Sequence, residues 1–176
     1  MNDMNILGVD PGLHTTGYGV IQARGSVVSL LEGGTIQCGS SSSALEERLA
    51  SLYDGLSEAL LEYRPQALAL EEVYSHYAYP ATAVIMGHAR GVICLAAAHN
   101  DVPVFSYAST RVKQCLAGNG RAAKAQVQRA IQARLGLPEP PEPNDVSDAL
   151  ALAICHWQTA SGNDMTLKAL AGARKR

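Results

Sequence analysis

VDPGLHTTGYGV, residues 9–20, holds the feature on which the interpretation of this chain depends. An apolar run ends on the carboxylate of Asp10, and a Pro-Gly pair turns the chain back at once. This short link predicts an antiparallel hairpin between residues 5–10 and residues 17–22. A carboxylate at the end of a buried strand needs a partner, because an isolated buried charge is costly. The candidates are a metal ion, a phosphate reached through hydrogen bonds, and an ordinary salt bridge.

The hydrophobic pattern outside this hairpin predicts alternating strands and helices. The expected strands are residues 5–10, 17–22, 27–37, 67–71 and 103–107, and the expected helices are about 45–63, 81–99, 109–116, 122–135 and 144–160. Three hairpin strands followed by strand–helix alternation predict an α/β fold, in which helices flank a mixed five-stranded sheet. We expect a single domain over residues 1–160 and a flexible basic tail over residues 161–176.

The distribution of charge is more informative than its sum. The net charge is −2, which alone predicts no binding to a polyanion. Residues 111–134, however, contain six basic side chains and no acidic one. Such a segment either attracts phosphates or forms a solvated helix face, and charge alone leaves both interpretations open.

Cysteine usage and hydropathy indicate a cytoplasmic protein. The four cysteines form no CxxC pair and have no histidine at zinc-finger spacing, so we expect reduced thiols. No signal peptide is expected at the N-terminus. No apolar run approaches the ~20 residues that span a bilayer, so no membrane association is expected.

Four carboxylates are placed where a site is expected. Asp10 and Glu71 each end an apolar strand, and Asp145 and Asp148 lie three residues apart at the start of a helix. If they converge, a hard cation such as Mg²⁺ or Mn²⁺ has to compensate their repulsion. Two such ions about 4 Å apart promote phosphodiester cleavage. Taken singly, each acid is better explained as a helix cap, a turn residue or an ion-pair partner. The four acids together, beside the basic segment, favour a metal site.

Five motifs together resemble a known family. They are ILGVDPGLHTTGYGVI, ALEEVY, ARGVICLAAA, VKQCLAGNGRAAKAQV and DVSDALALAICH, and their order and spacing resemble those of the RuvC Holliday-junction resolvases of bacteria over roughly residues 5–160. The resemblance implies an RNase H-like fold and a homodimer. It also implies paired, symmetric cleavage of four-way DNA junctions in recombination and repair, with Mg²⁺ or Mn²⁺, two ions per site. The branch-migration proteins RuvA and RuvB are the further partners that it implies, in the bacterial cytoplasm.

The resemblance also assigns the acidic residues. It implies that Asp10, Glu71, Asp145 and Asp148 are catalytic and bind the metal. Strand alternation places Glu71 and the neighbouring Glu72 on opposite faces of the sheet, and it does not tell which face holds the site. Only the resemblance favours Glu71.

Candidate DNA contacts lie in the basic segment and in a tyrosine-rich loop. Lys113 and Lys124 match lysines of the family pattern and are expected near the scissile phosphate. Tyr74 matches an aromatic position that stacks on bases near the crossover. Arg111 and Arg121 are expected along the arms of the DNA.

Two smaller features leave alternatives open. Thr15 and Thr16 either bind a phosphate or are ordinary strand residues. Ala83, Gly87 and Gly91 form a stripe of small residues that either packs between two copies of the chain or packs on its own sheet.

Two other functions also have to be considered. One is an actin-like or sugar-kinase ATPase lobe, whose phosphate loop likewise pairs a strand-end aspartate with glycine and threonine. The other is a non-catalytic module that binds junctions. The four acids argue against the second, and the length of the chain, which holds one lobe, argues against the first.

Overall fold

A computed structural model describes residues 3–12, 14–40, 42–72 and 80–173, with only the backbone given for 80, 81 and 163–173. Within these ranges the strands are β1 (Met4–Asp10), β2 (Thr15–Arg24), β3 (Val27–Gln37), β4 (Ala67–Glu71) and β5 (Val104–Tyr107). The helices are α1 (Leu45–Tyr63), α2 (Pro80–His99), α3 (Ser109–Ala117), α4 (Lys124–Leu135) and α5 (Asn144–Ala173).

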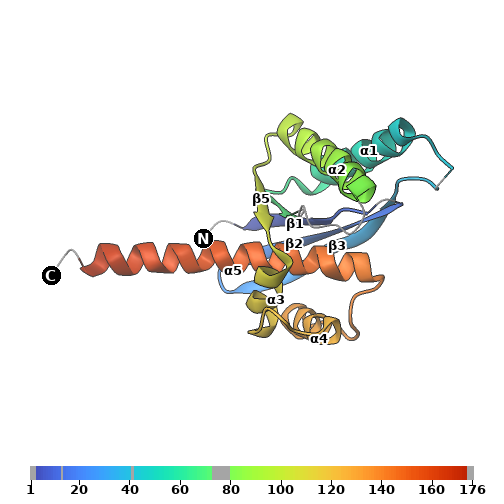
Figure 1. Cartoon of the computed structure of the whole chain (residues 1–176). Helices are drawn as coiled ribbons and strands as arrows, with labels where there is room; N and C mark the ends of the chain where they lie inside the picture. Colours follow the sequence, from blue (N-terminus) through green and yellow to red (C-terminus); the bar gives the residue numbers. More distant parts are fainter. Residues whose placement is uncertain (1–2, 13, 41, 73–79, 174–176) are drawn as a thin grey trace.

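The strands form one mixed sheet in the order β3-β2-β1-β4-β5 (Figure 1). β1, β2 and β3 pair antiparallel, and Asp10 lies opposite Gly17 in the predicted hairpin. β4 pairs parallel with β1, and β5 pairs parallel with β4. The predicted α/β fold with a mixed five-stranded sheet is therefore confirmed.

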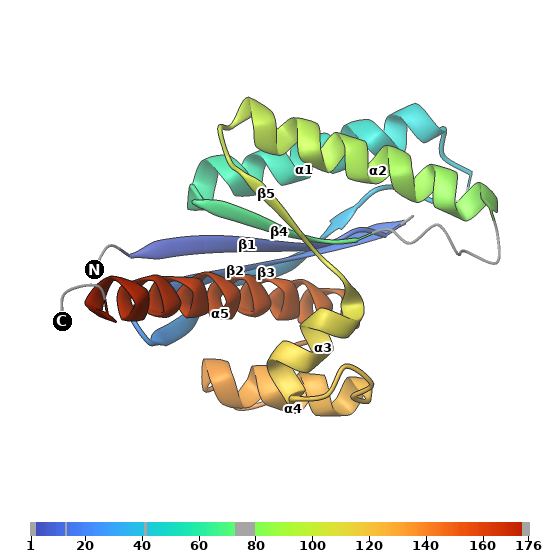
Figure 2. The same ribbon diagram turned by 60° about the vertical axis from the view of Figure 1, so that its left-hand side comes forward.

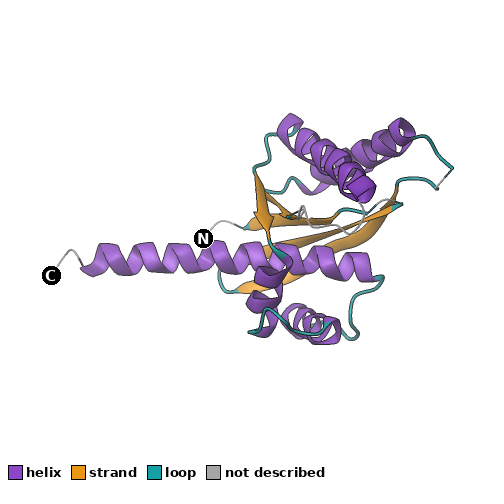
Figure 3. Cartoon of the chain, viewed as in Figure 1, coloured by secondary structure: helices purple, strands orange, loops and turns teal. Residues whose placement is uncertain are grey.

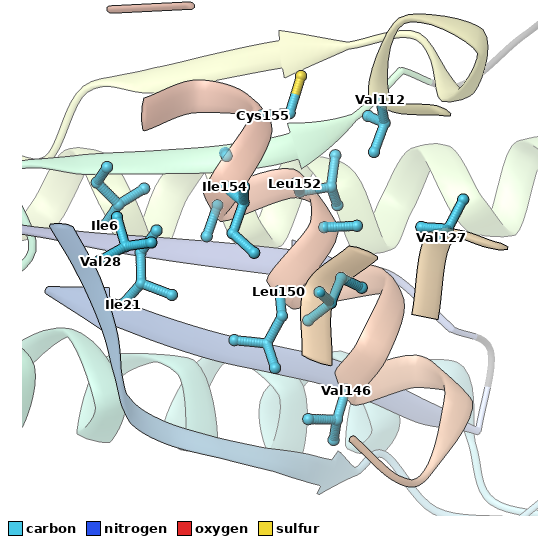
Figure 4. Packing of buried hydrophobic residues seen from close by; sticks show 14 of the residues in the cluster. Ile6, Ile21, Val28, Val112, Val127, Val146, Leu150, Leu152, Ile154 and Cys155 are labelled. Carbon is cyan, nitrogen blue, oxygen red and sulfur yellow. The ribbon is translucent and has the colours of Figure 1, made fainter. Parts of the chain in front are cut away.

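Helices cover both faces of the sheet (Figure 2). α1 and α2 lie on one face, and α5 lies on the other with α3 and α4 outside it; Figure 3 shows the same layers by type of element. Strand alternation sends Leu7 and Leu68 into the core beneath α1 and α2, whereas Ile6 and Ala69 belong to the core beneath α5. Figure 4 shows this second core, in which Ile6 and Ile21 lie near Leu150 and Ile154.

α5 packs unusually close to β1 and β2. A Cβ atom at Gly8 would lie 1.9 Å from the carbonyl oxygen of Ala149, and one at Gly17 would lie 2.2 Å from that of Asp145. Only glycine permits this approach, since any side chain would push the helix away. The two glycines therefore bring the first turns of α5 onto the strand end that carries Asp10.

The structure differs from the prediction in two helices. α5 continues to Ala173 instead of ending at about residue 160, because the sequence after Gly162 holds helix-forming residues and no proline. The expected division into residues 1–160 and a tail remains a prediction.

The second difference is in α2, where residues 82–99 are, by length and composition alone, long and apolar enough to cross a membrane. The expectation that no apolar run approaches that length is wrong for this helix.

Candidate active site

The two strand-end acids lie side by side. β1 and β4 are parallel neighbours whose register pairs Val9 with Leu70, so their next residues, Asp10 and Glu71, end both strands at the same edge of the sheet. Parallel strands bring their carboxyl ends together, which is where sites of α/β proteins are usually built.

Packing shows which face of β4 carries the site. Leu68 and Leu70 belong to the core under α1 and α2, whereas Ala69 belongs to the core under α5. By alternation, the side chain of Glu71 lies on the α5 face, and that of Glu72 does not. Glu71 is partly buried and Glu72 is exposed, which agrees with this placement.

A cavity of about 340 Å³ lies at this edge of the sheet. It collects side chains from β1, β4, α3, α4 and the first turns of α5, and its lining consists of Asp10, Glu71, Ser109, Val112, Lys113, Lys124, Val127, Asp148, Ala151 and Leu152. The sequence thus predicts five of these residues as site residues. Ser109 was missed, because a serine that begins a helix has no signal beyond that of a capping residue.

Burial and repulsion by neighbouring carboxylates raise the pKa values of Asp10 and Glu71. The pKa of Asp10 is raised from 3.8 to about 7. Burial is the largest cause, followed by the negative charges of Asp148, Glu71 and Asp145. The pKa of Glu71 is also raised, first by burial and then by Asp148. Asp145 does not line the cavity. Its negative charge, in the first turn of α5, nevertheless raises the pKa of Asp10.

Two lysines face the acids. Lys124 Nζ lies 2.8 Å from Asp148 Oδ2, and its charge lowers the pKa of Asp10. The positive charge of Lys113 partly offsets the rise in the pKa of Glu71. Because both lysines line the cavity, cationic groups from α3 and α4 stand opposite the carboxylates. The Lys124–Asp148 pair is largely solvent-exposed and contributes less than about 1 kcal/mol to stability.

The donor set fits a hard divalent cation. Among the described residues, no three histidine, cysteine or carboxylate side chains are arranged to hold one ion as they lie. The four acids nevertheless offer only oxygen ligands, which suit Mg²⁺ or Mn²⁺. After burial, the negative charges of Asp148, Glu71 and Asp145 raise the pKa of Asp10, and a bound cation would relieve this repulsion.

The other candidate residues lie outside the cavity. Arg111 is exposed on α3, and Arg121 is exposed in the link before α4. Tyr74 lies outside the described residues. Thr16 is fully buried and its Oγ1 accepts a hydrogen bond from the N–H of Gly12 at 3.3 Å, so it stabilises the turn after Asp10. Thr15 Oγ1 donates to Gln37 Oε1 at 3.2 Å across the hairpin. Both threonines therefore act as strand and turn residues.

Comparison with known proteins identifies the family. The family model described as "Crossover junction endodeoxyribonuclease RuvC" matches residues 6–156. The chain belongs to the RuvC family. A RuvC crossover junction endodeoxyribonuclease of Rhodopirellula baltica is 51% identical over 92% of this chain and 91% of its own length. That of Ruminiclostridium cellulolyticum is 43% identical over 96% of this chain and 98% of its own length.

A solved structure of a RuvC protein has the same architecture. The structure of Thermus thermophilus RuvC in complex with a Holliday junction substrate superimposes with a TM-score of 0.86, at 36% identity. The match covers 91% of this chain and 96% of that one. The RNase H-like fold expected from the resemblance is therefore confirmed. Membership of the RuvC nuclease family also implies dependence on a divalent metal ion.

Proposed function

We propose that this chain is a metal-dependent endonuclease that resolves Holliday junctions by paired, symmetric cuts during recombination and repair. The observation that carries this proposal is the convergence of carboxylates from β1, β4 and α5 with two lysines around one cavity. Its RuvC relatives are named as crossover junction endodeoxyribonucleases, and one was solved with a Holliday junction. A four-way DNA junction is accordingly the substrate.

The residues of the cavity divide into two roles. Asp10, Glu71, Asp145 and Asp148 hold Mg²⁺ or Mn²⁺, two ions per active site. When bound, the ions supply an activated water and stabilise the leaving oxygen. Lys113 and Lys124 bind the scissile phosphate, and their positive charge favours the more negative transition state over the ground state.

Residues away from the cavity contact the rest of the junction. Arg111 lies on α3 and Arg121 lies just before α4, and both helices are on the α5 side of the sheet (Figure 2). Both arginines are exposed and bind backbone phosphates along the arms. Tyr74 follows β4 closely in sequence and stacks on bases near the crossover.

A second copy of the chain packs on the outer face of α2. Cβ atoms added at Gly87 and Gly91 would meet nothing within 4 Å, so the small-residue stripe does not pack on its own sheet at these positions. Val84 and Leu95 on the same helix are 59% and 50% exposed. A helix face that is apolar and solvent-exposed marks an interaction surface. The two-fold symmetry of a four-way junction favours a C₂ homodimer as its use.

The cellular setting follows from the family. The bacterial relatives are named as crossover junction endodeoxyribonucleases, and because a bacterium holds its DNA in the cytoplasm, we place this protein there. RuvA and RuvB, which move the branch point, are its proposed partners. The outer face of α2 serves the dimer in this proposal and not a membrane.

A cleavage assay on a synthetic four-way junction tests the proposal. We expect symmetric nicks with Mg²⁺ or Mn²⁺ and none with EDTA. Asp10→Asn should abolish cutting and leave junction binding intact, because it removes a metal ligand and none of the basic surface. Asp54→Asn, which removes an exposed carboxylate on α1, is the matched control and should cut normally.

Other outcomes would identify the alternatives. Binding to the junction without cutting in either metal would indicate a non-catalytic junction-binding module. Release of phosphate from ATP, with no cutting, would indicate an ATPase lobe. Metal-dependent cutting by purified Asp10→Asn protein would contradict the assignment of the metal site.

A further inference from the structure

The guanidinium group of Arg90 joins α2 to the ends of two neighbouring strands. Arg90 Nη1 donates to the backbone carbonyl of Glu71 at 2.5 Å, and Nη2 donates to Ser106 Oγ at 2.5 Å. Glu71 ends β4, and Ser106 lies on β5. One side chain on the far face of the sheet from the cavity thus holds the strand edge at which the cavity lies.

An ion pair does not explain this arginine. Across the described ranges, no carboxylate lies within salt-bridge distance of Arg90, although its side chain is partly buried. A partly buried cation without a counter-ion opposes folding. The inward positions nearby on α2 carry Ala89 and Ile93, which are buried in the core and avoid that cost. Packing alone would therefore favour an apolar residue at position 90.

The carbonyl that Arg90 holds belongs to a residue of the cavity. The backbone of β4 continues through Glu72, whose N–H donates to the carbonyl oxygen of Tyr107 at 3.0 Å. The peptide between Glu71 and Glu72 is consequently held on one side by β5 and on the other by Arg90. Fixing this peptide fixes the direction in which the Glu71 side chain leaves the backbone.

We infer that Arg90 is a positioning residue for the cleavage reaction. It holds the end of β4 so that the Glu71 carboxylate stays beside Asp10 in the cavity. The inference rests on the proposed catalytic role of Glu71. It makes α2 part of the active-site support, because small displacements of a catalytic group lower the rate strongly.

Amide hydrogen exchange in the metal-free protein without DNA tests this role. In Arg90→Gln we expect the Glu72 amide to exchange about tenfold faster, because a hydrogen bond from a charged donor has been lost beside it. The amide of Leu68, which donates to the carbonyl oxygen of Pro103 at 2.9 Å at the other end of β4, should exchange at the wild-type rate. A general loss of stability would accelerate both amides.

Cleavage kinetics supply the second measurement. We expect the single-turnover rate of Arg90→Gln at saturating protein to fall about tenfold, with unchanged junction affinity, because only the position of Glu71 is altered. Arg90→Lys should recover part of both effects, since a single ammonium group cannot reach both acceptors with the geometry of a guanidinium. Arg24→Gln is the matched control, because Arg24 pairs with Asp3 at the opposite end of the sheet.

Two outcomes would overturn the inference. One is wild-type exchange at Glu72 in Arg90→Gln, and the other is equal acceleration at Glu72 and Leu68. A wild-type protein that cuts no junction would instead contradict the proposed function. The exchange experiment would still report whether Arg90 holds the end of β4, so the two failures are distinguishable.

Discussion

Asp10, a proposed metal ligand, lowers the stability of the metal-free protein when it is ionised, because it is buried. Its pKa is about 7 in the folded protein, against 3.8 for an ordinary aspartate, with burial the main cause. Between about pH 4 and pH 7 the folded state therefore keeps a proton that the unfolded chain has lost. Because the folded pKa is the higher one, rising pH through this window lowers the free energy of unfolding.

We expect Asp10→Asn to stabilise the metal-free protein in a pH-dependent way. The gain should be near zero at about pH 4, grow up to about pH 7 and then level off at a few kcal/mol, since asparagine does not ionise. Urea denaturation in EDTA, followed by circular dichroism, measures it. Added Mg²⁺ should shrink the difference by stabilising the wild type. A gain that is the same at every pH would show that the cause is not ionisation of Asp10.

At the scale of elements, the site depends on how closely α5 approaches the hairpin. A Cβ atom at Gly17 would lie 2.2 Å from the carbonyl oxygen and 2.7 Å from the Cβ atom of Asp145. Gly17 lies directly opposite Asp10 in the β1–β2 register. The same glycine therefore sets the distance between a strand-end acid and the first turn of α5.

We expect Gly17→Ala to fold and to cut poorly. The added methyl group has to displace the first turn of α5, which should lower the unfolding free energy by about 1–3 kcal/mol and the cleavage rate by tenfold or more. Single-turnover cleavage and urea denaturation measure the two effects. Gly162→Ala makes the same exchange further along α5, so it is the matched control and should cut normally. Normal cutting by Gly17→Ala would show that this contact does not position the acids.

Local patterns were sufficient to predict the strands and helices, apart from the C-terminal end of α5, and to select the four acids as candidates. The carboxylates at strand ends and the spacing of Asp145 and Asp148 can be recognised within short stretches of sequence, because hydrophobic periodicity in such a stretch predicts the strand or helix. The choice between Glu71 and Glu72 was not local. It depends on which helices cover each face of β4, and therefore on packing that strand alternation alone does not contain.

Contacts between distant segments were the part that the sequence could not supply. Thr16 was a candidate phosphate ligand, but its hydroxyl is used by the Gly12 amide, which requires the geometry of the turn. Arg90 lay inside a motif of the family resemblance without an assigned role, because its acceptors, on Glu71 and Ser106, belong to other elements. A single arginine in an otherwise apolar helix was the available signal.

At the scale of the whole molecule, one candidate active-site cavity in each chain has to be reconciled with two cuts in each junction. Resolution requires matched nicks on opposing strands, so two active sites must act within one complex. We propose that a C₂ homodimer provides them, with the same surface of both copies forming its interface. The outer face of α2 suits this use, because glycines at positions 87 and 91 permit close helix approach where Val84 and Leu95 supply apolar contact.

We expect Gly91→Leu to produce a folded monomer with uncoupled nicking. Among the described residues, a Cβ atom added at Gly91 would meet nothing within 4 Å, so the fold should tolerate a side chain there. A leucine would, however, separate two helices that meet at this position. Sedimentation velocity measures the association state. A supercoiled plasmid with an extruded cruciform measures coupling, because paired cuts give linear DNA and single cuts give nicked circles. Gly162→Leu adds the same side chain on α5 instead of α2, so it is the matched control and should remain a dimer that linearises the plasmid. A wild-type protein that sediments as a monomer at micromolar concentration, yet linearises the plasmid without a nicked intermediate, would refute the preformed dimer.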